Sequence, residues 1–170
     1  LMFDAEIRTQ WTQEIFDRQW AADPRLHSEY DARRRRRMLE DIAYNLACLN
    51  TAVMYGAEDV FTDYALWIYD LLVYRMPDLS RERIRDHMVV HYDTIAEVIG
   101  EHENGDGLKA YLRHLENAKQ VAAQAAAGKA FSKESANKYP TVYEQYLGHI
   151  LGGRRAEASR LVLESIQQGI

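Results

Sequence analysis

The chain has 170 residues, enough for one domain with a substantial core or for one domain and part of a second. Of these residues 47% are hydrophobic and 28% are charged, a balance that excludes a disordered chain. The formal net charge of −5 argues against general affinity for nucleic acid, whose phosphates require surplus lysine and arginine.

Helix breakers are scarce, with 3 prolines and 9 glycines among many strong helix formers, so we expect an all-α fold. A single cysteine, Cys48, leaves no disulfide possible within one chain, which favours a reducing compartment. No apolar run approaches the roughly 20 residues of a membrane span, and the first residues lack a signal-peptide charge pattern. We therefore expect a cytoplasmic protein that does not contact membranes.

The first two helices are predicted from apolar residues that recur at helical spacing. The first ends near Trp20, before a break over residues 21–31 in which Asp23 acts as a cap and Pro24 occupies a first turn. The second begins with the arginine run at 33–37 and ends near Gly56. Their expected buried residues are Ile7, Trp11, Ile15 and Phe16, followed by Met38, Leu39, Ile42, Leu46, Leu49 and Val53.

Three further helices follow by the same criteria. The third covers about residues 60–74, and the fourth opens at Ser80 and carries His87 and His91 on its apolar face. The segment ENGDG, residues 103–107, is the clearest turn signal, since asparagine and glycine tolerate positive φ. A fifth helix starts near residue 108, and its alanine-rich end is expected to leave the bundle as a connector.

His87 and His91 lie one helical turn apart, so both side chains project from one face of the fourth helix. Such a pair can bind a metal, ligate haem iron, hydrogen-bond a bilin or simply pack in a core. No HExxH or Glu-x-x-His motif accompanies the pair, so we expect no metal site. G-x-S-x-G, phosphate-loop and GxGxxG motifs are also absent from the sequence, and we expect no enzymatic activity.

Aromatic residues are abundant, with 11 tyrosines, 3 tryptophans and 4 phenylalanines. Large flat ligands bind in apolar pockets lined by aromatic side chains, although the same residues also serve ordinary core packing. Arg33, Arg34 or Arg37 can pair with the carboxylates of such a ligand, because guanidinium groups match carboxylate geometry. The alternative is that the arginine run is only the solvated start of a helix.

Residues 35–75, RRRMLEDIAYNLACLNTAVMYGAEDVFTDYALWIYDLLVYR, carry a first resemblance through Asp41, Leu46, Leu49, Ala52, Phe61, Tyr64 and Trp67. This stretch resembles the globin-like N-terminal sensor region of bacterial cobalamin-binding proteins, including the photocobilin type, which pairs a bilin with a cobalamin. The resemblance implies that the helical domain holds biliverdin. Asn45 stands where the pattern of that region has a histidine.

Residues 143–170, YEQYLGHILGGRRAEASRLVLESIQQGI, carry a second resemblance through Tyr146, Leu147, Ile150, Leu151, Gly152, Gly153, Arg154, Ala158, Leu161, Val162 and Gly169. They resemble the start of the helical cap that precedes the Rossmann-like domain of cobalamin-binding proteins. The Asp-x-His-x-x-Gly signature that supplies the lower axial histidine to cobalt does not occur in the sequence. We therefore expect the natural protein to continue past residue 170, and cobalamin to bind only if a downstream domain is present.

These patterns together predict a globin-like helical bundle over residues 1–128, a linker over 129–140 and the first helices of a cap over 141–170. The bundle is expected to be a photoreceptor-type sensor that binds a tetrapyrrole, with biliverdin as first choice, and relays the state of that ligand. The expected pocket residues are His87, His91, Tyr64, Trp67 and Arg37. A haem sensor with an axial histidine and a non-pigmented, globin-like adaptor remain open. The apolar stripes of the last two helices predict association into a homo-oligomer.

Overall fold

The computed structural model describes residues 5–128 and residues 157, 160, 161 and 164. It divides the chain into two compact units, Leu1–Phe131 and Ser132–Ile170. Within residues 5–128 the chain forms six helices and no strand, which confirms the predicted all-α bundle. The predicted linker and cap lie outside the described residues, except for the four helical residues between 157 and 164.

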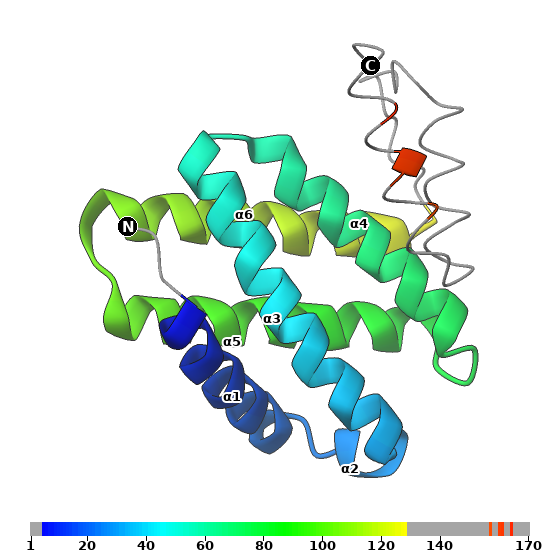
Figure 1. Cartoon of the computed structure of the whole chain (residues 1–170). Coiled ribbons are helices and arrows are strands. Elements are labelled where there is room, and N and C mark those ends of the chain that lie inside the picture. Colours follow the sequence, from blue (N-terminus) through cyan, green and yellow to red (C-terminus); the bar gives the residue numbers. More distant parts are fainter. Residues whose placement is uncertain (1–4, 129–156, 158–159, 162–163, 165–170) are drawn as a thin grey trace. The chain divides into compact units, whose positions relative to one another are not determined.

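Six helices follow one another with short connections (Figure 1). They are α1 (Ala5–Ala22), α2 (Leu26–Glu29), α3 (Ala32–Tyr55), α4 (Glu58–Arg75), α5 (Arg81–His102) and α6 (Gly105–Ala126). Asp31 and Ser80 cap α3 and α5, since their side-chain oxygens accept hydrogen bonds from the backbone N–H groups of Arg34 and Arg83. Gly56 ends α3 at a φ of 61°, a conformation that glycine adopts without strain.

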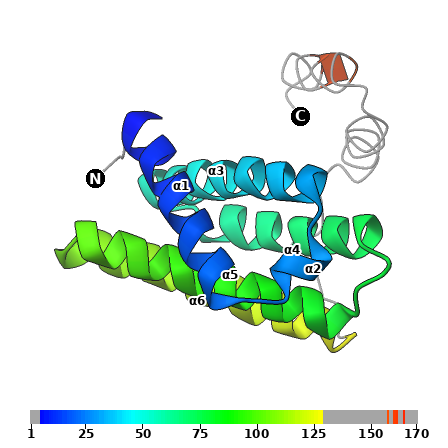
Figure 2. The same cartoon turned by 90° about the horizontal axis from the view of Figure 1, so that it is seen from below.

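The helices enclose one continuous core. Helices α5 and α6 pack along each other, α4 contacts both of them, and α3 lies against α4 and α6. Helix α1 contacts α3 and α5 and runs from the level of α3 to that of α5 (Figure 2). The core includes Ile15, Phe16, Ile42, Leu46, Leu49, Phe61, Tyr69, Tyr92, Ile95, Tyr111 and Leu115. None of the helices in residues 5–128 combines the length and the apolar content needed to cross a bilayer.

Four local predictions are wrong. Asp23 does not cap the next helix and Pro24 does not lie in its first turn, because α2 begins at Leu26 with Arg25 at its N-cap position. The alanine-rich stretch does not leave the bundle, because α6 continues to Ala126 with Val121 and Ala122 buried. The turn after α5 is shorter than ENGDG, since Gly105 already begins α6. Ile7 is exposed, because it lies in the first turn of α1, before the segment that packs against the other helices.

Candidate functional site

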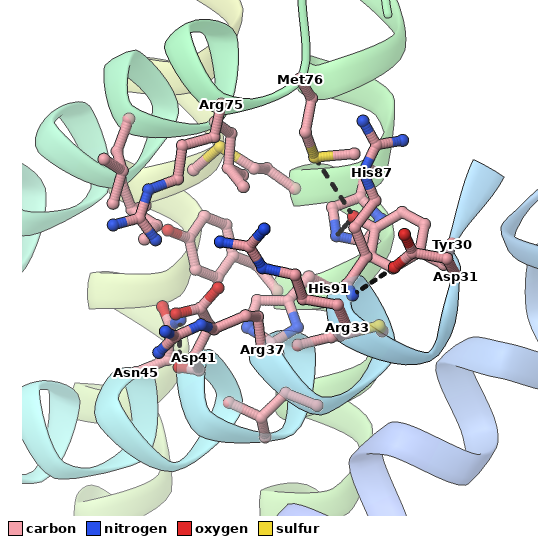
Figure 3. A pocket seen from close by; sticks show the side chains of 18 residues that line it. Tyr30, Asp31, Arg33, Arg37, Asp41, Asn45, Arg75, Met76, His87 and His91 are labelled. Atoms are coloured by element: carbon pink, nitrogen blue, oxygen red, sulfur yellow. Dashed lines mark hydrogen bonds between the residues drawn. The ribbon is translucent and has the colours of Figure 1, made fainter. Parts of the chain in front are cut away.

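A cavity of about 460 Å³ opens between the first half of α3, the end of α4 and the middle of α5 (Figure 3). Its volume falls within the range of pockets that bury drug-sized ligands. The lining residues recur at helical spacing on each of the three helices, so that one face of each helix borders the cavity. The apolar part of the lining consists of Met38, Ile42, Ile68, Leu71, Leu72, Met76 and Met88.

His91 lies on the buried side of the cavity and is held by α1. Its Nδ1 atom is 2.9 Å from Oε1 of Gln19, a side chain that is itself fully buried. Burial lowers the pKa of His91 to about 3, and the neighbouring His87 contributes in the same direction. His91 is therefore neutral at pH 7, and its ring is fixed by a hydrogen bond from outside the cavity.

His87 lies one turn earlier on α5 and also contacts Gln19, whose Nε2 atom is 3.4 Å from the His87 carbonyl oxygen and 3.5 Å from His87 Nδ1. The Nε2 atom of His87 is 3.2 Å from the hydroxyl of Tyr30, which in turn lies 3.9 Å from the sulfur of Met76. Burial lowers the pKa of His87 to about 4, and Arg83 adds to that shift. His87 is thus neutral at pH 7 and has hydrogen-bond neighbours at both ring nitrogens.

Three buried polar atoms of the cavity lining have no hydrogen-bond partner anywhere in the described residues. They are Nε2 of His91, Oδ1 of Asn45 and the hydroxyl of Tyr92. Asn45 and His91 come from α3 and α5 respectively and lie on the same side of the cavity (Figure 3). A buried polar atom without a partner loses the hydrogen bond that it makes to water in the unfolded chain.

Four arginines line the cavity, and two of them have an ion-pair partner within residues 5–128. Arg34 forms a two-point ion pair with Asp78 at 2.6 and 2.9 Å, and Arg37 lies 2.7 Å from Glu40. Arg33 and Arg75 form no ion pair with any described residue, and they approach from α3 and α4 on opposite sides of the cavity (Figure 3). Arg33 and Arg37 are exposed, so both interpretations of the arginine run stay open.

Asp41 is the carboxylate nearest the interior of the cavity. Burial raises its pKa to about 6, and the positive charges of Arg75 and Arg37 oppose that shift without cancelling it. Asp41 is thus able to change its protonation state close to neutral pH. The lining carries a net excess of positive charge, because it holds four arginines and only two carboxylates, Asp31 and Asp41.

The structure brings three of the five predicted pocket residues to this cavity, namely His87, His91 and Arg37. Tyr64 and Trp67 are placed elsewhere on α4: their rings lie 5.8 Å apart, and Tyr64 stacks on Phe61 at 6.1 Å. Sequence analysis did not assign Gln19, Tyr30 or Arg75 to the site. A signal existed for Arg75, which shares one face of α4 with Ile68 and Leu72, at spacings of three and four residues.

One other cluster has side chains of the types that bind metals. The ligand atoms of Glu14, Glu101 and His102 lie within 4.8 Å of one another. Arg18 already pairs with Glu14 at 2.5 Å and with Glu101 at 2.6 Å, so a cation would have to displace a guanidinium group. Among the described residues this is the one such group of three, and it does not include His87 or His91.

The chain matches no protein-family model, no curated protein and no solved structure. The resemblance of residues 35–75 to photocobilin-type sensors therefore stays a prediction.

Proposed function

We propose that this domain binds a bilin in the cavity between α3, α4 and α5 and relays the state of that ligand to a partner. One observation carries the proposal: the cavity lining combines apolar side chains with three buried polar atoms and two arginines that have no partner among the described residues. Cavities that merely result from imperfect packing are lined by apolar atoms, because unpaired polar groups are costly to bury.

A bilin matches both parts of this pattern. Its four ring nitrogens and two terminal carbonyls offer donors and acceptors to His91, Asn45 and Tyr92, while its ring system fills the apolar space. Its two propionate carboxylates fit Arg33 and Arg75, because a guanidinium group binds a carboxylate through two parallel hydrogen bonds. Arg37 remains a further candidate, although Glu40 competes for it.

A haem is the second candidate, and a specific contact favours it. An imidazole that ligates iron commonly donates its other N–H to a fixed acceptor, as the His91 ring does to Gln19. However, the ring nitrogens of a haem are all bonded to iron, so it would leave Asn45 Oδ1 and the Tyr92 hydroxyl without partners. A bilin therefore offers hydrogen-bond partners to more of the unpaired polar atoms of the lining than a haem does.

The relay rests on the contacts that join the cavity to α1 and α2. A ligand changes the balance between two packings only through contacts that differ between them. Gln19 links α1 to both histidines, and Tyr30 links the end of α2 to His87. Arg83 also pairs with Asp23 at 2.8 Å and with Glu29, so α5 holds this whole segment. A shift at His91 would reach α1 and α2 first.

Absorbance titrations with biliverdin and with haem test this proposal. We expect biliverdin to bind in a 1:1 ratio with a shifted, intensified red band, and His91→Ala to weaken that binding. His102→Ala is the matched control, since His102 lies on the same helix but is exposed and outside the cavity. A Soret band that moves with His91→Ala would favour the haem sensor, and no spectral change with either ligand would favour the adaptor.

A further inference from the structure

Gln19 lies outside the cavity but contacts both histidines that line it. Its side chain extends from α1, is fully buried and places its amide between His87 and His91 of α5. A glutamine amide has one end that only accepts hydrogen bonds and one end that only donates them. Which end faces which histidine therefore decides where each ring carries its proton.

A backbone carbonyl settles the orientation of this amide. The carbonyl oxygen of His87 can only accept, and it lies 3.4 Å from Nε2 of Gln19. The opposite orientation would direct two carbonyl oxygens at each other. Oε1 of Gln19 therefore faces His91 Nδ1, at 2.9 Å, and an oxygen that only accepts requires a proton on that nitrogen.

The same amide assigns the opposite tautomer to His87. The Nε2 group of Gln19 donates toward His87 Nδ1 at 3.5 Å, so that nitrogen carries no proton. The proton of His87 is then on Nε2, which donates to the Tyr30 hydroxyl at 3.2 Å. The Tyr30 hydroxyl in turn donates to the sulfur of Met76. Every contact in this chain has a donor on one side and an acceptor on the other.

We infer that Gln19 determines which ligand group the cavity accepts: it holds His91 in the Nδ1–H tautomer, so that the unshared electron pair of Nε2 takes a hydrogen bond from a ring N–H of the ligand. This inference rests on the proposed function and specifies it further. A pyrrole N–H of a bilin fits that position, and a terminal carbonyl does not. His91 is neutral at pH 7, since burial lowers its pKa to about 3.

An electron pair on imidazole also binds metal ions, but the surroundings favour an N–H group. Within the described residues, His91 belongs to no group of three imidazole, thiol or carboxylate side chains at the spacing of a metal site. His87 Nε2 carries a proton in this scheme and faces Tyr30, so it is not free to coordinate. An iron or zinc ion would have His91 as its one protein ligand from this pair.

The tautomers are directly measurable without any ligand. Long-range ¹H–¹⁵N spectra of the whole chain labelled at histidine distinguish a protonated from an unprotonated ring nitrogen, and His91→Asn and His87→Asn assign the signals. We expect Nδ1–H at His91 and Nε2–H at His87 at pH 7. A proton on Nε2 of His91 in the wild-type protein would overturn the inference, whatever the result of the biliverdin titration.

Gln19→Met tests the role of the amide, because methionine has a similar length but offers His91 Nδ1 only a weak sulfur acceptor in place of the amide oxygen. We expect His91 to gain the Nε2–H form that free imidazole side chains favour, and biliverdin affinity to fall about tenfold. Gln13→Met is the control, since Gln13 lies on the exposed side of α1. An unchanged His91 tautomer in Gln19→Met would contradict the inference. If wild-type protein fails to bind biliverdin, the proposed function fails, but the tautomer result stands by itself.

Discussion

The two halves of α3 face different interiors. The first half contributes Arg34, Asp41 and Asn45 to the same face as Met38 and Ile42, and a cavity lies against it. The second half presents fully buried apolar side chains, Leu46, Leu49 and Ala52, to a closed core. Helix α5 shows the same division: His87 and His91 border the cavity, and Ile95, Val98 and Ile99 follow in the closed part.

This comparison shows that burial alone does not distinguish a core from a binding site. Asn45 and His91 are nearly as buried as Leu49, yet each retains a polar atom without a partner. At the closed end, the buried hydroxyl of Tyr111 donates to Asn50 at 2.8 Å. The hydroxyl of Tyr69 in the core is also unpaired among the described residues, so what distinguishes the cavity end is that three such atoms belong to one lining.

The largest difference in the free energy of unfolding should come from removing apolar side chains at the closed end and at the cavity end of the bundle. We expect Ile95→Ala, in the closed core, to lower the free energy of unfolding by about 2–5 kcal/mol, because it creates a new cavity. Ile42→Ala should cost less than Ile95→Ala, since Ile42 already borders open space and loses fewer packing contacts. Urea unfolding of both variants measures this. Equal losses at both sites would show that the cavity end is packed as tightly as the core.

Acid should destabilise the domain through the cavity end. His87 and His91 have folded-state pKa values of about 4 and 3, well below the ordinary 6.5, so their stabilising contribution is complete above pH 6.5 and declines as the pH falls toward 3. Each histidine adds a slope of up to about 1.4 kcal/mol per pH unit in that window. Asp41 acts in the opposite sense. Because its folded-state pKa is raised to about 6, its contribution to the free energy of unfolding declines as the pH rises toward 6.

Unfolding curves between pH 4.5 and 7 separate the contribution of the two histidines to stability from that of Asp41. His91→Asn should flatten the dependence of stability on pH, because the residue at position 91 no longer titrates. Asp41→Asn should make it steeper, because the opposing contribution disappears. If His91→Asn leaves the slope as it is in the wild-type protein, the imidazole is not buried in its neutral form.

The arginines at the mouth should separate into binding and structural residues. We expect Arg75→Gln to lower biliverdin affinity about tenfold, since it removes the guanidinium group that we propose to bind a propionate and that has no ion-pair partner among the described residues. Arg36→Gln, an exposed neighbour in the run that does not line the cavity, is the control. Biliverdin dimethyl ester should bind the wild-type protein and Arg75→Gln equally. A full Arg75 effect on the ester would exclude a carboxylate contact.

The smallest effect on the free energy of unfolding should come from removing one buried tyrosine hydroxyl at each end of the bundle. Its sign should differ between the two ends. Tyr111→Phe removes a hydroxyl that is bonded to Asn50, and we expect a loss of about 1 kcal/mol in the free energy of unfolding. Tyr92→Phe removes an unpaired hydroxyl, and we expect no loss or a gain of up to about 1 kcal/mol in the ligand-free protein. Thermal unfolding of both variants decides it, and a destabilised Tyr92→Phe would mean that the hydroxyl already has a partner.

Much of the fold is encoded locally and was predictable. Ser80 and Gly56 were predicted as helix ends and act through contacts within a few residues, and helical spacing placed His87 and His91 on one face of α5; the cap at Asp31 was not predicted. The site could not be predicted from local patterns, because it depends on tertiary packing. Gln19 is separated from His91 by 72 positions and reaches it only after α1 packs on α5. Tyr64 and Trp67 have the same spacing as pocket residues, and only packing shows that their rings lie next to each other and outside the cavity lining.

Biliverdin binding mapped by ¹H–¹⁵N chemical shifts tests the central claim most directly, because it compares both ends of the bundle in one experiment. The account predicts that a 1:1 complex shifts the backbone signals of Asn45, Arg75 and His91 and leaves those of Leu49, Ala52 and Leu115 nearly unchanged. Shifts confined to the outer surface or to the closed core, or no shifts at saturating biliverdin, would contradict it.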